Sequence, residues 1–277
     1  MDLYNSTSLS CSKIFTTEYS TSFSKAVSRL HPSIQDDIYA IYGFVRITDE
    51  IVDTFHDHPK RQLLADFRTR AYQSIEQKIS TNPILNSFQL VVNRYNIPHE
   101  LIDSFLESMR MDLEQQEHND ETYKKYIYGS AEVVGLMCLK VFCNGNQQLY
   151  DELTHPARSL GEAFQKVNFL RDLKSDFEER GRFYFPSVDF ENFSEDEKRK
   201  IEDDIEADLK KSLEGIRKLP PKAKLGVYIA YVYFRALLLR IKRVKAANLM
   251  NERIRVSDPM KYLLMLKARL DVLFRIV

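Results

Sequence analysis

The fold is decided by the stretch Gly161–Pro186, GEAFQKVNFLRDLKSDFEERGRFYFP. As a helix of 3.6 residues per turn, it carries one polar stripe with spacings of three, four and four residues: Gln165, Asn168, Asp172 and Asp176. The flanks of this stripe are largely apolar, so much of the helix is expected to be buried. A carboxylate facing an apolar interior is costly without a positive partner, so the two aspartates predict a divalent cation, Mg²⁺ or Mn²⁺. For a single DxxxD pair a solvated surface is the alternative, and a second pair therefore decides the interpretation.

The second pair lies in Ile34–Phe55, which is apolar nearly all round and is expected to run through the core. One face of this helix is polar and contains Tyr42, Arg46, Asp49 and Asp53. If the two helices face each other, four carboxylates surround one cavity and need cations between them. With Arg46 and Arg171 at the rim, such a site suits a highly charged oxyanion, above all a diphosphate.

The remainder of the chain also has helical periodicity, and no strand alternation or repeat is present. Ser33 is the expected N-cap of the second helix. Together with Ile34–Phe55, the expected helices are Ser10–Leu30, Pro59–Ile79, Pro83–Tyr95, Pro98–Gln116, Thr122–Phe142, Pro156–Arg180, Glu195–Leu219, Lys222–Leu249 and Pro259–Phe274. Only eight glycines and nine prolines occur in 277 residues, which favours long helices. We therefore predict an all-α fold, a single domain of about ten helices over residues 1–277.

Composition excludes several partners and compartments. The formal net charge is zero and no basic patch with interleaved aromatic residues occurs, so no nucleic-acid partner is expected. Three cysteines without CxxC spacing indicate a reducing compartment. The first thirty residues lack a secretory signal, and the longest apolar run, Leu225–Phe234, is too short to span a bilayer. A soluble cytoplasmic protein is expected, with peripheral membrane association left open.

Aromatic and small residues predict the walls of the cavity. Small side chains cluster in the middle of Thr122–Phe142, at Gly129, Ser130, Ala131 and Gly135. They allow close approach of a ligand or of another helix, and tight helix packing explains them equally well. The expected apolar wall also contains Phe23, Tyr39, Tyr42 and Phe164. An apolar tunnel below a metal–diphosphate site suits an isoprenyl diphosphate, because aromatic faces stabilise an allylic cation and excluded water cannot capture it.

Five motifs in order identify a family resemblance: TSFSKAVSRL, YGFVRITDEIVD, MRMDL, YIYGSAEVVG and GEAFQKVNFLRDLKSDFEERGRFYFP. Over nearly its whole length the chain resembles the squalene/phytoene synthase family, and its bacterial phytoene synthases above all. The resemblance implies an isoprenoid-synthase-type helical bundle around a central cavity. It also implies head-to-head condensation of two identical prenyl diphosphates through a cyclopropylcarbinyl diphosphate, with Mg²⁺ or Mn²⁺ as cofactor.

The resemblance assigns roles to individual residues. The metal ligands would be Asp49, Asp53, Asp172 and Asp176. The catalytic residues would be Tyr42, Arg46, Tyr126 and Arg171. The substrate-binding residues would be Ser20, Ser22, Phe23, Gln165, Asn168 and Tyr184. The expected cavity wall adds Val27, Tyr39, Ala131, Val134 and Gly135 to the substrate-binding set.

Two positions depart from the family pattern. Glu132 replaces a glycine in the usual VAGxVG motif, and Tyr19 stands where some members have histidine. Glu132 therefore needs a partner or must face away from the tunnel. The small side chain of Val27, one turn after Phe23, leaves room for a long chain.

The leading expectation is a phytoene synthase that uses C20 geranylgeranyl diphosphate and needs no NADPH. A squalene or dehydrosqualene synthase using C15 farnesyl diphosphate is the nearest alternative. A non-catalytic lipid-binding or assembly relative is more remote, and a chain elongase would carry a DDxxD motif in place of the first pair. The sequence does not indicate an oligomeric state.

Overall fold

The computed structural model describes residues 1–277 except 115–117, 179–181, 183, 187, 189–192 and 250–252. The described residues form helices and no strand, which confirms the all-α prediction. The α-helices are α1 Asp2–Tyr19, α2 Thr21–Val27, α3 Pro32–Asp53, α4 Lys60–Gln77, α5 Pro83–Tyr95, α6 His99–Glu114, α7 Asp120–Ile127, α8 Val133–Cys143, α9 Gln147–Glu178, α10 Glu195–Lys218, α11 Pro221–Ile241, α12 Ala246–Leu249 and α13 Asp258–Leu273, and the π-helical turn η1 covers Tyr128–Glu132.

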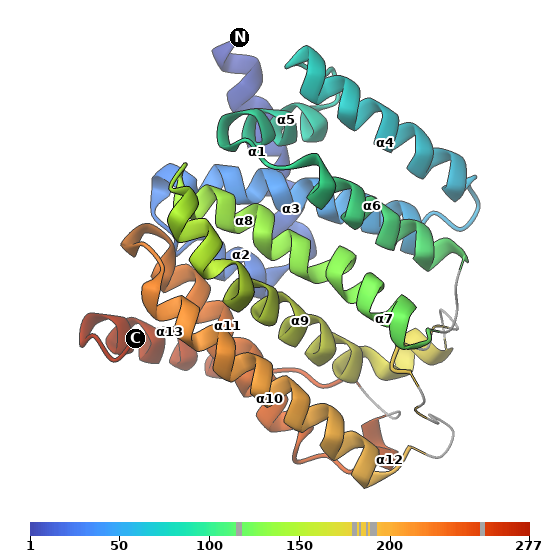
Figure 1. Ribbon diagram of the computed structural model, residues 1–277, viewed down its shortest axis with the longest axis vertical. Helices are drawn as coiled ribbons and strands as arrows, with labels where there is room; N and C mark the ends of the chain where they lie inside the picture. The colour runs from blue at the N-terminus through green and yellow to red at the C-terminus, as the bar shows by residue number, and fades with distance from the viewer. Residues whose placement is uncertain (115–117, 179–181, 183, 187, 189–192, 250–252) are drawn as a thin grey trace.

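From one end of the molecule to the other the helices follow the chain only broadly, because α2 packs against α11 and α8 lies beside α3 (Figure 1). Helices α1 and α3–α6 form one end, α10–α13 form the other, and α7–α9 lie between them. The two helices that carry the aspartate pairs are therefore α3, from the first group, and α9, from the middle group.

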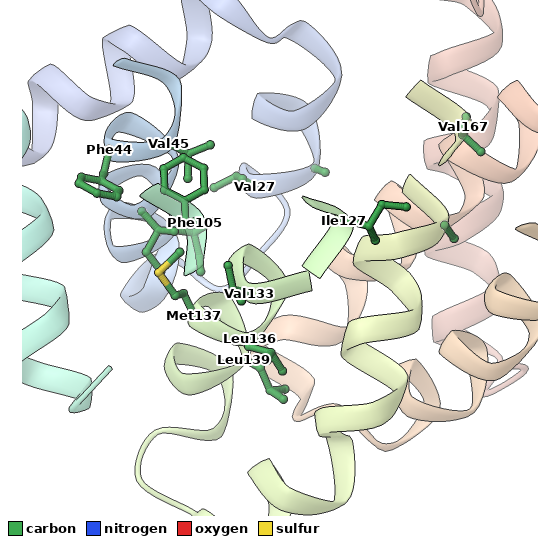
Figure 2. Close-up of a cluster of buried hydrophobic side chains, with 14 of the residues drawn as sticks. Val27, Phe44, Val45, Phe105, Ile127, Val133, Leu136, Met137, Leu139 and Val167 are labelled. Carbon is green, nitrogen blue, oxygen red and sulfur yellow. The ribbon is translucent and has the colours of Figure 1, made fainter. Parts of the chain in front are cut away.

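Helix α3 lies in the core as expected. Phe44 stacks on Phe88 of α5 with ring centroids 3.9 Å apart, and both side chains are fully buried. Figure 2 shows Phe44 grouped with Phe105 and Met137, which come from α6 and α8. A rigid packed core of this kind fixes the direction of α3, and hence the direction of its polar face.

The N-cap of α3 is His31, and the assignment of Ser33 was wrong. The Nδ1 atom of His31 accepts a hydrogen bond from the amide of Ser33 at 3.3 Å, and Pro32 occupies the first helical position. Proline is favoured there because its fixed φ suits the helix and its missing N–H would have had no partner within the helix.

Three predicted helices are interrupted in the structure. Ser20 has an extended backbone, with φ −143°, and ends α1; its side chain then caps α2 by accepting from the amide of Phe23 at 3.4 Å. The segment Thr122–Phe142 contains the π turn η1, which separates α7 from α8. Lys222–Leu249 is likewise divided into α11 and α12.

Helix α9 begins at Gln147, and the prediction that it begins at Pro156 was wrong. Proline inside a helix removes one backbone hydrogen bond and clashes with the preceding turn, so it normally marks a boundary. Here Pro156 packs against Gly215 of α10, where an added Cβ would lie 2.3 Å from the Pro156 Cβ atom. Packing against α10 thus continues the helix through the proline.

One helical stretch of the described chain, Asp120–Cys143, is long and apolar enough to cross a membrane by length and composition, with a mean hydropathy of 1.4. This differs from the expectation that no segment would reach that length. Of its most apolar window, 56% is buried inside the protein, as in the core helix of a soluble protein. The stretch is therefore weak support for a membrane span.

Candidate active site

A cavity of about 960 Å³ lies between α2, α3, α8, α9 and α11. Helix α3 lines it with Ile38, Tyr42, Val45, Arg46, Asp49 and Asp53. Helix α9 lines it from Leu153 at one end to Asp176 at the other. Asp112 lies near both Asp53 and Asp176, so the polar ends of both helices lie at the same end of the cavity. The structure therefore brings the two predicted aspartate pairs to one cavity, with apolar walls beyond them.

The aspartate pair of α3 is held beside Arg46. The guanidinium lies 3.6 Å from Asp49, forms an ion pair with Glu50, and stacks over the Tyr19 ring at 4.7 Å. Its Nε atom is buried and has no hydrogen-bond partner among the described residues. Arg46 is thus fixed in orientation and retains a donor for a ligand.

In the aspartate pair of α9, two arginines compensate the charge of Asp172. Asp172 accepts from Arg171 Nε at 3.0 Å, and Arg253 Nε lies 2.6 Å from the same carboxylate. Asp176 lines the cavity one turn further on and is buried. Arg253 follows α12 and was not predicted, because it lies far from every motif in the sequence.

A second polar cluster joins the two pairs. The Tyr126 hydroxyl donates to Asp112 at 3.0 Å, and the Tyr184 hydroxyl lies 3.5 Å from the same carboxylate. Arg182 donates to Asp53 at 2.9 Å, and its Nε lies 3.7 Å from Asp112. Neither Asp112 nor Arg182 was predicted as a site residue. Both lie within the motifs MRMDL and GRFYFP, which gave a signal for them.

Electrostatics at this end of the cavity favour a cation. Burial raises the pKa of Asp49 to about 8, with nearby Asp53 and Asp112 adding to the effect of burial and Arg46 opposing it. Burial also raises the pKa of Asp112 to about 7, against the effect of Arg182. Crowded carboxylates of this kind are stabilised by a positive ion.

The donor set fits a hard divalent cation. The carboxylates of both pairs line the cavity, and the buried Oδ1 of Asn168 has no hydrogen-bond partner among the described residues. Carboxylate and amide oxygens are ligands that Mg²⁺ and Mn²⁺ prefer.

A separate carboxylate cluster lies outside this cavity. The ligand oxygens of Glu162, Asp204 and Asp208 lie within 4.8 Å of one another. The buried ammonium of Lys166 sits among them, 2.7 Å from Glu162 and 2.8 Å from Asp208, and it also pairs with Asp204. This cluster is an ion-pair network between α9 and α10, because the lysine already supplies the positive charge.

Most predicted substrate-binding residues line the cavity. They are Ser20, Ser22, Phe23, Val27, Ala131, Val134, Gly135, Gln165, Asn168 and Tyr184. Phe23 stacks on Tyr42 at 4.4 Å, which joins α2 to α3 in one aromatic wall. Tyr39 is the exception, because it is not among the residues that line the cavity. Its hydroxyl points to the Ser24 carbonyl at 3.4 Å and its ring lies under Lys13 of α1, while Ile38 and Tyr42 form the cavity wall on α3.

The small residues in and near η1 allow both close helix packing and close approach of a ligand to the cavity wall. A Cβ added to Gly129 would lie 2.3 Å from the Ser104 carbonyl oxygen, so Gly129 allows η1 to pack against α6. A Cβ on Gly161 would lie 2.7 Å from the carbonyl oxygen of Ala131. Ala131 and Gly135 also line the cavity. Close helix packing therefore positions the wall that a ligand would contact.

Glu132 faces away from the cavity and has a partner. Its side chain is buried, and Arg158 of α9 donates to it at 2.5 Å. Arg158 also lies over the Tyr128 ring at 5.2 Å. The departure from the family motif is thus compensated by an ion pair between η1 and α9.

The fold matches that of known prenyl synthases. A crystal structure described as a dehydrosqualene synthase in complex with ligand superposes with a TM-score of 0.82 over 97% of both chains, at 20% identity. Squalene synthase HpnC from Alicyclobacillus acidocaldarius gives a TM-score of 0.74 over 87% of this chain and 95% of its own, at 21% identity. This likeness shows that the chain has the same all-helical fold as these two proteins.

The squalene/phytoene synthase family profile matches residues 16–259, and the chain belongs to this family of prenyltransferase-type synthases. A 15-cis-phytoene synthase of Synechocystis is 28% identical over 281 residues, covering 90% of this chain and 80% of that protein. A 4,4'-diapophytoene synthase of Staphylococcus haemolyticus is 26% identical over 193 residues, covering 69% of this chain. The match spans 65% of the staphylococcal protein's own length.

Proposed function

We propose that this protein condenses two prenyl diphosphates head to head into a linear hydrocarbon, with phytoene from C20 substrate as the product. The observation that supports this most directly is the division of one cavity into two parts. Two aspartate pairs and several arginines occupy one end, and apolar and aromatic side chains line the remainder. A prenyl diphosphate has the same division, with a charged head and a long apolar tail.

Residues of the polar end would bind the diphosphate. A divalent cation, held by Asp49, Asp53, Asp172 and Asp176, would neutralise charge on the leaving diphosphate. Arg46 and the neighbouring guanidiniums offer paired N–H donors, which match phosphate oxygens better than a lysine does.

Residues of the walls would protect the carbocation. Phe23 and Tyr42 present stacked aromatic faces to the cavity, and such faces stabilise a cation. Burial raises the pKa of Tyr126 well above its usual value, with the Asp112 charge adding to it, so this hydroxyl keeps its proton and remains a donor. Enclosure of the tail by α2, α8, α9 and α11 would exclude the water that captures allylic cations.

The depth of the cavity supports the longer substrate. Val27 lines it together with Leu30, and the apolar end extends to Gly215 and Gly226 of α10 and α11. The proposed C20 reaction needs no reductant. A C15 reaction giving dehydrosqualene or squalene is the second candidate, and it is supported by the names of the diapophytoene and dehydrosqualene synthases similar to this chain.

Incubation of the purified protein with Mg²⁺ and either C15 or C20 prenyl diphosphate tests the proposal. Extracted hydrocarbons are identified by mass spectrometry, with and without NADPH, and Asp172→Asn is the inactive control. Phytoene from C20 substrate without NADPH supports the proposal. Hydrocarbon from C15 substrate alone establishes the second candidate. Substrate binding without any hydrocarbon would make the protein a non-catalytic lipid-binding relative.

A further inference from the structure

Helix α13 carries an apolar stripe on the face that it turns away from the protein. Fourteen large apolar side chains are exposed in the described part of the chain, and eight of them lie between Met260 and Ile276. The stripe consists of Tyr262, Leu263, Leu266, Leu270, Leu273 and Phe274, with exposures of 43–70%. Single exposed apolar residues are ordinary, but a contiguous group at helical spacing marks a contact surface.

The opposite face of α13 packs on the protein. Ala268 is fully buried, and α11 lies against this side of the helix. Residues two positions before and after Ala268 point about 160° from it at 3.6 residues per turn, and these are Leu266 and Leu270. A surface helix normally has polar residues there. Helix α13 therefore lacks the solvated face that water would favour.

Basic side chains flank the apolar stripe. Lys267 and Arg269 adjoin Ala268 and so lie about 100° from it in opposite directions around the helix. Arg275 follows at the end of the helix, and all three side chains are exposed. The whole chain has no net charge, yet four basic residues lie on or directly after α13, Lys261, Lys267, Arg269 and Arg275, against two carboxylates, Asp258 and Asp271, which pair with Lys261 and Lys267. Two copies of such a surface would repel each other, whereas an anionic lipid surface complements it.

The start of α13 borders the cavity. Lys261 in its first turn lines the cavity, as do Ile254 and Val256 in the preceding segment. Figure 1 shows α13 at the edge of the molecule beside α11. A surface bound to α13 would therefore lie next to the cavity.

We propose that α13 docks the protein on an anionic membrane, with its apolar stripe inserted at the interface and its basic flanks on the lipid headgroups. Amphipathic helices with basic polar edges bind membranes in this orientation. Under the proposed function, this placement would let a water-insoluble hydrocarbon pass from the cavity into lipid.

Flotation with lipid vesicles tests this docking surface. Vesicles of phosphatidylcholine with about one third phosphatidylglycerol should bind the protein, and binding should fall at high salt. Leu266→Glu combined with Leu270→Glu should reduce the vesicle-bound fraction at least tenfold, since both side chains lose apolar burial. Leu3→Glu combined with Ile14→Glu on α1 is the matched control, because these residues are also exposed, and should leave binding unchanged.

The charge contribution is tested separately. Arg269→Glu combined with Arg275→Glu should weaken binding to anionic vesicles and leave binding to pure phosphatidylcholine unchanged. Equal flotation of the wild type and the double-leucine variant would overturn the proposal. The proposal would also be overturned if light scattering without lipid shows that the wild type is a dimer and that the double-leucine variant is a monomer. Asp172→Asn should still bind vesicles, so failure of docking is distinguishable from failure of the proposed catalysis.

Discussion

Substitution of Val27 by phenylalanine tests the depth of the cavity. Val27 is only 2% exposed, lines the cavity from α2, and belongs to the same buried cluster as Val45 (Figure 2). It lies one turn beyond Phe23 on α2. A larger side chain here would occupy space that the tail of the substrate needs.

The magnitude follows from the atoms added. Phenylalanine has four more side-chain carbons than valine, close to the five carbons of one isoprene unit. At about 0.8 kcal/mol per buried CH₂, a C20 substrate that can no longer bury these carbons loses about 3 kcal/mol. This corresponds to a decrease of roughly two-hundred-fold in kcat/KM, whereas a C15 substrate ending short of this position is little affected.

The assay is the ratio of kcat/KM for C20 and C15 diphosphates, measured for the wild type and each variant. Val27→Phe should lower this ratio, and Val27→Ala should hold or raise it. The melting temperature is followed in parallel, because overpacking costs roughly 1–3 kcal/mol of stability. A ratio that stays constant in a folded Val27→Phe protein would refute the assignment of Val27 to the tunnel end, and with it this support for a C20 substrate.

Further predictions concern substitutions of charged residues, in the candidate site and in the contact between η1 and α9. Asp49→Asn and Asp172→Asn should each lower turnover by several orders of magnitude, because a bound cation loses a ligand. Without metal, Asp49→Asn should raise the melting temperature by relieving carboxylate repulsion, while Asp172→Asn should lower it by breaking two arginine pairs. Arg46→Lys should raise KM, because lysine lacks the planar fork that grips phosphate. Arg158→Ala should destabilise the fold by about 2 kcal/mol, because Glu132 stays buried without its partner.

Matched controls separate these effects from general damage. Asp203→Asn removes an exposed carboxylate of α10 and should change neither turnover nor melting. Lys218→Ala breaks an exposed pair with Glu152 and should leave the melting temperature nearly unchanged, because solvent screens exposed ion pairs. Burial raises the pKa of Glu132 in the folded protein. The destabilisation by Arg158→Ala should therefore be small at about pH 3, where this carboxyl is protonated in both the folded and the unfolded state, and should grow toward pH 7. Wild-type turnover in Asp49→Asn would contradict the metal-ligand assignment, and an unchanged KM in Arg46→Lys would contradict the role of Arg46 in binding diphosphate. A loss of stability in Arg158→Ala that does not depend on pH would contradict the pairing argument for Glu132.

Helix ends with local signals could be predicted from the sequence. Helix α5 begins and ends as expected, because Asn82 caps it, Pro83 occupies its first position, and Asn96 ends it with φ 49°. The start of α9 could not be predicted, because the packing of Pro156 against Gly215 depends on a helix sixty residues away. The break at Ser20 lacks glycine and proline, and it results from a serine cap that a continuous helical pattern conceals.

In the candidate site, too, some residues could be predicted from local sequence patterns and others could not. Regular spacing on one helix revealed each aspartate pair, since residues three and four apart share a face. Asp112, Arg182 and Arg253 come singly from three different segments, and only the tertiary fold places them beside those pairs. The position of Tyr39 outside the cavity lining could not be predicted, because α3 is apolar nearly all round and its sequence does not distinguish the cavity side from the side packed on α1.

The π turn at Tyr128–Glu132 has a consequence for insertions and deletions. In an unbroken α-helix, Tyr126 and Val134 would point about 80° apart, but one extra residue per π turn offsets this by about 100°. Both residues consequently line the same cavity. Loss of a single residue anywhere in this turn would restore a regular helix. Tyr126 would then no longer point to the same side as Val134. In this segment the number of residues constrains viable sequences as strongly as their identity does.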